Sequence, residues 1–146
     1  MHTRVLLVNP TDPDESAVAL AAEVIRRGGL VAFPTETVYG LGADGLNEVA
    51  VHRVYEVKGR PRGRGLILHV QSPAWLQRLG RSVPQSACAL ADEFWPGPLT
   101  IVVRRAASIP AEVCGGSDKV AIRAPDHPVA QALIRAADTP IAAPSA

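Results

Sequence analysis

Two short segments on either side of a predicted helix carry the side chains best suited to binding a polar ligand. In the first, PTETVYGLG at 34–42, Thr35 and Thr37 offer hydroxyl groups able to hold an ammonium or a carboxylate. The second, KGRPRGR at 58–64, places four cations within seven residues. Hydroxyl groups around a small polar molecule and cations around a phosphate together predict an enzyme that brings a small polar substrate to a nucleotide.

The basic segment is a candidate phosphate site. Lys58, Arg60, Arg62 and Arg64 alternate with glycine and proline. In an extended chain, residues two apart face the same side, so we expect these four side chains to converge on one anion. Glycine lets the backbone approach the ligand, and the planar fork of arginine matches phosphate oxygens. The alternative is a basic loop that is solvated or that contacts RNA phosphates.

The hydroxyl-bearing segment has two interpretations. Pro34 fixes the chain as it leaves a strand, and Gly40 and Gly42 permit backbone turns that other residues disfavour. The segment forms either the wall of a substrate site or a tight strand-to-helix connection capped by its own hydroxyls. We expect Glu36 to be a solvated or structural carboxylate rather than a general base.

Two further polar residues stand at the ends of apolar runs. His69 lies in LILHV at 66–70, where a lone histidine is more often a satisfied structural residue than a catalyst. Arg123 ends VAIR at 120–123, and a buried arginine needs a partner anion from the protein or from a ligand. No two histidines have the spacing of metal ligands, so no metal site in the protein is predicted.

These residues need elements that position them, and the alternation of apolar runs with helical periodicity predicts an α/β fold with helices flanking a twisted sheet. Asn47 is expected to cap one helix, and Gly28-Gly29 to end another. The run at 99–103 is continuously apolar, as in strands buried on both faces. Strands are expected at 5–8, 30–33, 66–70, 99–103, 120–123 and 140–143, and helices at 15–27, 48–57, 73–79, 84–94 and 127–136.

Composition is that of one ordinary globular domain, with 146 residues, 47% hydrophobic and 20% charged. The formal net charge of +1 provides no global field for nucleic acid or an anionic membrane, so an anion site must be local.

Cys88 and Cys114 do not have the spacing of metal ligands or of a redox motif, and we expect both to be reduced thiols. No apolar run approaches the roughly 20 residues of a membrane span. The N-terminal stretch does not resemble a signal peptide, so we expect a cytoplasmic protein.

Six segments in order resemble the YrdC-like family of threonylcarbamoyl-AMP synthases, which begin the synthesis of tRNA threonylcarbamoyladenosine (t6A). They are PTETVYGLGAD (34–44), KGRP (58–61), LILHV (66–70), FWPGPLT (94–100), VAIRAPDHP (120–128) and PIAAPSA (140–146). The resemblance implies a twisted mixed sheet with a large concave cavity on one side. It also implies that residues 1–146 form a single YrdC-like domain lacking the family's C-terminal part, because the last segment stops before the family's asparagine.

The resemblance also implies two groups of site residues. At the nucleotide, Lys58, Arg60 and Ser145 would be catalytic and bind ATP, with Arg64 as a further ATP contact. The implied reaction, a nucleotidyl transfer, joins L-threonine, bicarbonate (or carbon dioxide) and ATP into threonylcarbamoyl-AMP and pyrophosphate, with Mg²⁺ carried by ATP. At the amino acid, the implied contacts are Thr35, Thr37, His69, Lys119, Arg123 and Ala143.

The product of that reaction would pass to a downstream tRNA-modifying threonylcarbamoyl transferase complex. Three alternatives stay open. One is a carbamoyltransferase-type YrdC domain, as in hydrogenase maturation or antibiotic carbamoylation. Another is a double-stranded-RNA or ribosome-associated binding module that uses the basic loop for RNA contact. The third is an inactive fragment.

Overall fold

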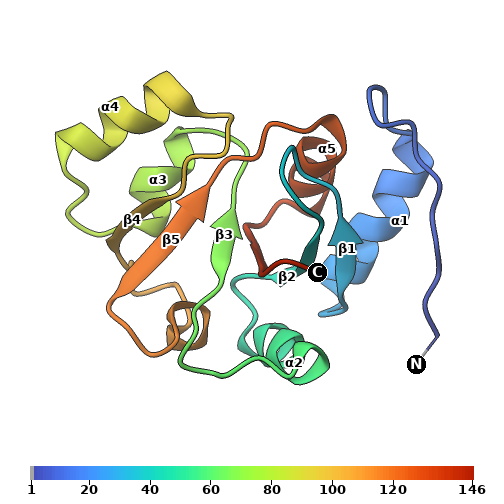
Figure 1. Ribbon diagram of the computed structural model, residues 1–146, viewed down its shortest axis with the longest axis horizontal. Coiled ribbons are helices and arrows are strands. Elements are labelled where there is room, and N and C mark those ends of the chain that lie inside the picture. The colour runs from blue at the N-terminus through green and yellow to red at the C-terminus, as the bar shows by residue number, and fades with distance from the viewer. Residues whose placement is uncertain (1) are drawn as a thin grey trace.

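The computed structural model describes residues 2–146 and joins six strands in one mixed sheet with the order β1-β2-β6-β3-β5-β4 (Figure 1). The neighbouring strands β3 and β5 run parallel, and the four other neighbouring pairs run antiparallel. The expected mixed α/β sheet is confirmed. The strands are β1 (Val31–Phe33), β2 (Gly40–Asp44), β3 (Ile67–His69), β4 (Ile101–Arg104), β5 (Lys119–Arg123) and β6 (Ile141–Ala143).

Five α-helices and one 3-10 helix flank the sheet. In Figure 1, α1 lies beside α5 near β1, α3 and α4 lie near β4, and α2 lies below the sheet. None of the helices in residues 2–146 is long and apolar enough to cross a membrane. The helices are α1 (Glu15–Arg26), α2 (Glu48–Lys58), α3 (Ala74–Leu79), α4 (Gln85–Phe94), the 3-10 helix η1 (Ala111–Cys114) and α5 (Pro128–Ala137).

Two hydrophobic clusters hold the helices to the sheet. Around the first, Leu68 of β3 and Ile122 of β5 are fully buried beside residues of α2, α3 and α4. In the second, Phe33 and Ile141 are buried with residues of α1 and α5. Burial of each such side chain contributes about 1.5–3 kcal/mol, so these two clusters hold the helices firmly against the sheet.

The predicted helix ends are confirmed for α1 and α2. The Asn47 side-chain oxygen accepts a hydrogen bond from the Ala50 backbone N–H at 3.2 Å, which satisfies one free donor of the first turn of α2. Gly28, just beyond α1, has a φ of +78°. Because this left-handed conformation is accessible to glycine at low cost, the chain turns there from α1 towards β1.

Two expectations about strands were wrong. Residues 5–8 form no strand, and Val5 and Leu7 are 80% and 90% exposed. An apolar run makes a strand only where a neighbouring strand offers backbone partners, and no described strand pairs with this segment. The strand β4 exists, but Val102 is 59% exposed, because β4 is the edge of the sheet and presents one face to solvent.

The strand β2 was missed, since its residues were interpreted as a connection. Gly40 and Gly42 are needed there for close packing rather than for a left-handed turn, as neither has a positive φ. A Cβ at Gly42 would lie 2.5 Å from Ile141 Cγ2 and 2.7 Å from Phe33 Cε1. These glycines therefore let β2 pair with β1 and β6 directly over the Phe33 ring.

Candidate functional site

A cleft of about 190 Å³ opens where β2, β3, β5 and β6 meet the loops around them. Ile67 and His69 of β3 both line it, because residues two apart in a strand face the same side. The parallel register sets Arg123 of β5 beside His69. The full lining consists of Thr35, Val38, Tyr39, Gly40, Arg60, Gly65, Leu66, Ile67, His69, Arg123, Ala143, Pro144 and Ser145.

The hydroxyl-bearing segment and the basic loop open into this same cleft. Thr35 lines it from one side and Arg60 from the other, although a strand and a helix separate them in sequence. Thr37 lies directly behind the lining, with its hydroxyl 3.1 Å from the Thr35 hydroxyl. Both segments therefore contribute side chains to one cleft.

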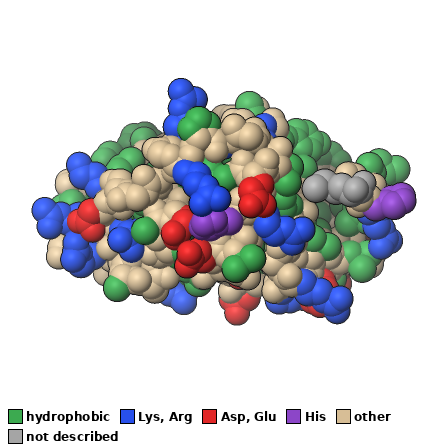
Figure 2. Space-filling model, turned by 90° about the horizontal axis from the view of Figure 1, so that it is seen from below, with side chains coloured by type: hydrophobic (Ala, Val, Ile, Leu, Met, Phe, Trp, Pro, Cys, Tyr) green, Lys and Arg blue, Asp and Glu red, His purple; other side chains and the backbone are tan. Residues whose placement is uncertain are grey.

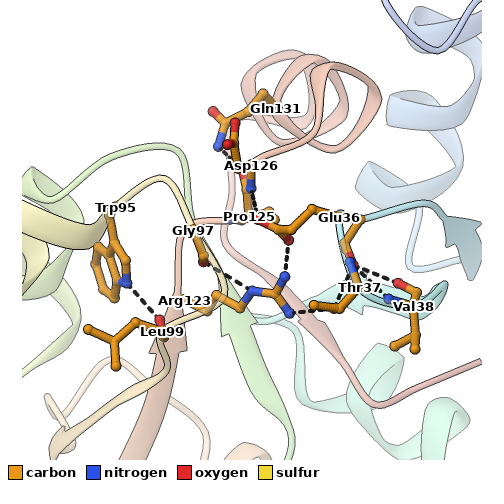
Figure 3. Close-up of polar contacts among 11 residues, drawn as sticks. Glu36, Thr37, Val38, Trp95, Gly97, Leu99, Arg123, Pro125, Asp126 and Gln131 are labelled. Carbon is orange, nitrogen blue, oxygen red and sulfur yellow. Dashed lines mark hydrogen bonds and ion pairs between the residues drawn. The ribbon is translucent and has the colours of Figure 1, made fainter.

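Arg123 reaches the cleft from the end of β5 and is almost fully buried. Its guanidinium donates to the Gly97 carbonyl at 3.3 Å and to the Thr37 hydroxyl at 3.1 Å (Figure 3). It also forms an ion pair with the Glu36 carboxylate. Burial lowers the pKa of Arg123 from its ordinary value, but a guanidinium stays protonated in proteins. The anion that this buried arginine requires is thus supplied by the protein itself.

Glu36 is a structural carboxylate, as expected. Its second oxygen accepts a hydrogen bond from the Asp126 backbone N–H, at the connection between β5 and α5 (Figure 3). Both oxygens are therefore engaged, one by a charged partner and one by the backbone. This arrangement fixes the segment between β1 and β2 against the end of β5, and it leaves no free base at Glu36.

His69 is held in one orientation by backbone carbonyls. Its Nδ1 lies 3.1 Å from the Ile67 oxygen and 3.2 Å from the Ile141 oxygen. Phe33 packs edge-on against the ring, with the ring centroids 5.5 Å apart. Carbonyls only accept hydrogen bonds, so Nδ1 carries the proton and Nε2 is left as an acceptor. Burial lowers the pKa of His69, although the Ile141 and Ile67 carbonyls oppose that shift.

The basic segment does not have the extended conformation that its alternating sequence suggested. Lys58 is the last residue of α2, and Gly59 then adopts the left-handed conformation with a φ of +56°. The Arg64 N–H donates to the Pro61 carbonyl at 3.0 Å, which closes a turn. Since the chain is first helical and then turned, its side chains do not alternate between two sides, and the prediction that all four cations converge was wrong.

Arg60 is the one cation of this segment that lines the cleft in the described chain. Its Nε donates to the Arg64 carbonyl at 3.1 Å, and its Nη2 donates to the Gly65 carbonyl at 2.8 Å. These hydrogen bonds hold residues 60–65 in a compact loop, and the Arg60 side chain also lines the cleft. Lys58 and Arg64 line neither this cleft nor the one beside it, and their roles at a nucleotide stay predictions.

The remaining candidates divide between two adjoining clefts. Ala143 and Ser145 line the first, where an isolated bridge joins Ser145 to Gly40. Lys119 instead lines a second cleft of about 340 Å³, together with Ile67 of β3 and Ala121 of β5. The two clefts share Gly65, Leu66 and Ile67, so a ligand longer than an amino acid could extend from one to the other.

Tyr55 supports the basic loop and was not recognised from sequence as part of the site. Its hydroxyl donates to the Glu112 carbonyl at 2.7 Å and lies 3.2 Å from the Arg64 carbonyl. Burial raises the pKa of Tyr55 above its ordinary value, so the hydroxyl keeps its proton. A buried tyrosine hydroxyl needs a hydrogen-bond partner. The position of Tyr55 one helical turn before KGR was the sequence feature that could have indicated its contact with the basic loop.

Comparison with known proteins identifies the family of this chain. A model of the Sua5/YciO/YrdC family, described as telomere recombination, matches residues 23–146. The chain belongs to this family. It is 50% identical over 133 residues to a Pyrococcus abyssi protein named threonylcarbamoyl-AMP synthase, covering 91% of this chain and 39% of that protein. A Bacillus subtilis protein of the same name is 45% identical over 150 residues, covering 100% of this chain and 43% of that protein.

A solved structure of the family shares the fold closely. The structure of P. abyssi Sua5 complexed with L-threonine superposes with a TM-score of 0.92 at 47% identity. The match covers 97% of this chain and 42% of that one. The YrdC-like chain described here therefore spans about two fifths of the length of these relatives.

Proposed function

We propose that this YrdC-like chain provides the site of an L-threonylcarbamoyl-AMP synthase, which makes threonylcarbamoyl-AMP and pyrophosphate for t6A modification of tRNA. The observation that carries the proposal is the single cleft that brings Thr35, His69 and Arg123 together with Arg60 and Ser145. The relatives named threonylcarbamoyl-AMP synthase and the threonine complex of P. abyssi Sua5 support it. We place the reaction in the cytoplasm.

The amino-acid part of the cleft suits a zwitterion. Arg123 would bind the threonine carboxylate through the guanidinium N–H groups that Gly97, Thr37 and Glu36 leave free, and the hydroxyls of Thr35 and Thr37 would orient the polar groups beside it. His69 is neutral and presents an acceptor nitrogen, which suits an ammonium or a hydroxyl group. Ala143 would leave room for the side chain, and Lys119 would contact the ligand only if it extends into the second cleft.

The nucleotide part would act by electrostatics. Arg60 and Ser145 at the cleft, with Lys58 and Arg64 from the same loop, would neutralise charge on the α-phosphoryl oxygens and the departing pyrophosphate. The lining holds two arginines and, within residues 2–146, no carboxylate. This donor set fits a Mg²⁺ that enters coordinated by the phosphates of ATP, and that ion would supply further charge neutralisation.

The chemistry requires positioning more than a covalent catalyst. The threonine amine captures carbon dioxide to give a carbamate, and a carbamate oxygen then attacks the α-phosphorus while pyrophosphate leaves. A carbamate readily reverts in water, so a cleft that excludes water favours the reaction. Holding the carbamate and ATP in line supplies much of the remaining rate enhancement.

A pyrophosphate-release assay tests the proposal. Purified protein is supplied with ATP, bicarbonate and either L-threonine, L-serine or no amino acid. We expect release that depends on both bicarbonate and threonine. The assay is run on this chain and on a C-terminally extended version, and absence of threonine-dependent release from both would overturn the proposal.

Two other activities are outcomes of the same experiment. Turnover with carbamoyl phosphate in place of threonine and bicarbonate would indicate a carbamoyltransferase. Binding of double-stranded RNA with a steep salt dependence, without any turnover, would indicate an RNA-binding module. We also propose that the product passes to a tRNA-modifying threonylcarbamoyl transferase complex, which transfer to tRNA in a coupled assay would test.

A further inference from the structure

We propose that Glu48, His52 and Glu112 form a divalent-metal site that takes a Zn²⁺-type ion, outside the substrate cleft. Glu48 and His52 are four residues apart on α2 and so lie on the same face of the helix. Glu112 approaches from η1. One ligand atom from each of the three residues lies within 4.8 Å of the others.

The His52 ring nitrogen points at both carboxylates without a hydrogen bond to either. Its Nε2 lies 3.9 Å from a Glu48 oxygen and 3.9 Å from a Glu112 oxygen, which is too long for a hydrogen bond. This nitrogen has almost no solvent-accessible area and no partner in the described chain. A buried polar atom without a partner is costly, and a bound cation would satisfy it.

The donor set fits a transition metal better than a hard cation. An imidazole and two carboxylates are ligands of Zn²⁺, whereas Mg²⁺ prefers oxygen donors alone. Bonds of 2.0–2.1 Å in a tetrahedral site place ligand atoms about 3.3 Å apart, so each 3.9 Å separation needs to shorten by only about 0.6 Å. Two carboxylates and a neutral imidazole carry two negative charges, which balance the ion. The fourth position would hold water.

The surroundings allow the carboxylates to move towards His52. Glu48 lies in the first turn of α2 with most of its side chain exposed, so its carboxylate can swing towards His52. Glu112 is fixed by its backbone, whose carbonyl accepts the Tyr55 hydroxyl. Figure 2, which views the molecule from below, shows acidic side chains and a basic side chain around a histidine near the centre of this face. An ion here would join α2 to η1, the two elements that flank the basic loop.

The test is a titration of the untagged, metal-free 146-residue chain with ZnCl₂ by isothermal calorimetry, and with Co²⁺ by visible absorption. We expect one equivalent to bind, with the Co²⁺ spectrum of a tetrahedral site. Loss of a residue that hydrogen-bonds to a metal ligand weakens metal affinity 10–100-fold. His52→Ala and Glu112→Gln remove ligands themselves, so each should weaken it by about 100-fold. Glu93→Gln, exposed on α4 and away from this cluster, and His2→Ala are the matched controls and should bind as the wild type does.

Two results would overturn the site. One is no binding at millimolar Zn²⁺. The other is binding that survives both His52→Ala and Glu112→Gln, which would place the ion elsewhere, for example on the free thiols of Cys88 or Cys114. Circular dichroism of each variant without metal establishes that the fold is kept. Because the two variants act on different elements, a folding defect in one still leaves the other to decide.

Discussion

Arg123 and Glu36 form an ion pair that joins the end of β5 to the segment between β1 and β2. The two residues are 87 positions apart, and Arg123 is the member of the pair that lines the candidate cleft. The same contact stabilises the fold and sets the position of the arginine that would receive the threonine carboxylate.

Glu36→Gln should lower the free energy of unfolding by about 2–3 kcal/mol, because it leaves a buried guanidinium without its charged partner. We expect a loss near the lower end for buried pairs, since the Glu36 side chain is 22% exposed and glutamine keeps an acceptor. Urea denaturation measures the change. Glu93→Gln, on the exposed face of α4, is the control, and an equal effect of both variants would contradict a special role for the pair.

Gly42→Ala should destabilise the sheet by about 1–3 kcal/mol, because the new methyl group would overlap Ile141 and Phe33. Thermal unfolding is the measurement. Gly63→Ala is the matched control, as a Cβ there meets no atom within 4 Å. If the two substitutions lower the melting temperature equally, close packing of β2 is not the reason for glycine at position 42.

His69 should make stability depend on pH. The fold lowers the pKa of His69, so between that value and about 6.5 the unfolded chain binds a proton that the folded chain does not. Stability from this residue is therefore complete above pH 6.5 and is lost as pH falls through the folded pKa, at up to about 1.4 kcal/mol per pH unit. Denaturation of wild type and His69→Gln from pH 8 to pH 5 measures it. A difference between the two that stays constant with pH would count against the prediction.

Arg60→Ala should reduce threonine-dependent pyrophosphate release by at least 100-fold, because Arg60 is the cation of the basic loop that faces the cleft. The side chain also closes the loop through the Arg64 and Gly65 carbonyls, so part of the loss would come from loop geometry. Arg60→Lys keeps the charge but not the planar fork and separates the two effects. Arg62→Ala, exposed on the same loop, should keep the wild-type rate. Wild-type release from Arg60→Ala would remove Arg60 from the site.

Local sequence patterns determined most of the helices and strands of this chain. Asn47 and Gly28 mark helix ends through contacts with their immediate neighbours, and LILHV has the apolar character of a buried strand wherever it is placed. Such features depend on hydrogen bonds and side-chain preferences over a few residues, so they can be recognised without the fold.

Features that depend on residues far apart in the sequence could be recognised only from the three-dimensional structure. The run at 5–8 looked like a strand, but no strand within residues 2–146 pairs with it. The strand β2 was not recognised because its glycines, which leave room for Phe33 and Ile141, resemble turn residues. The alternation of cations at 58–64 suggested that all four converge. Because α2 ends there and the chain then turns, Arg60 is the one cation of this segment that lines the cleft in the described chain. Glu48, His52 and Glu112 likewise meet only because α2 packs against η1. Contacts of this kind are set by how the elements pack, and sequence spacing carries no record of that packing.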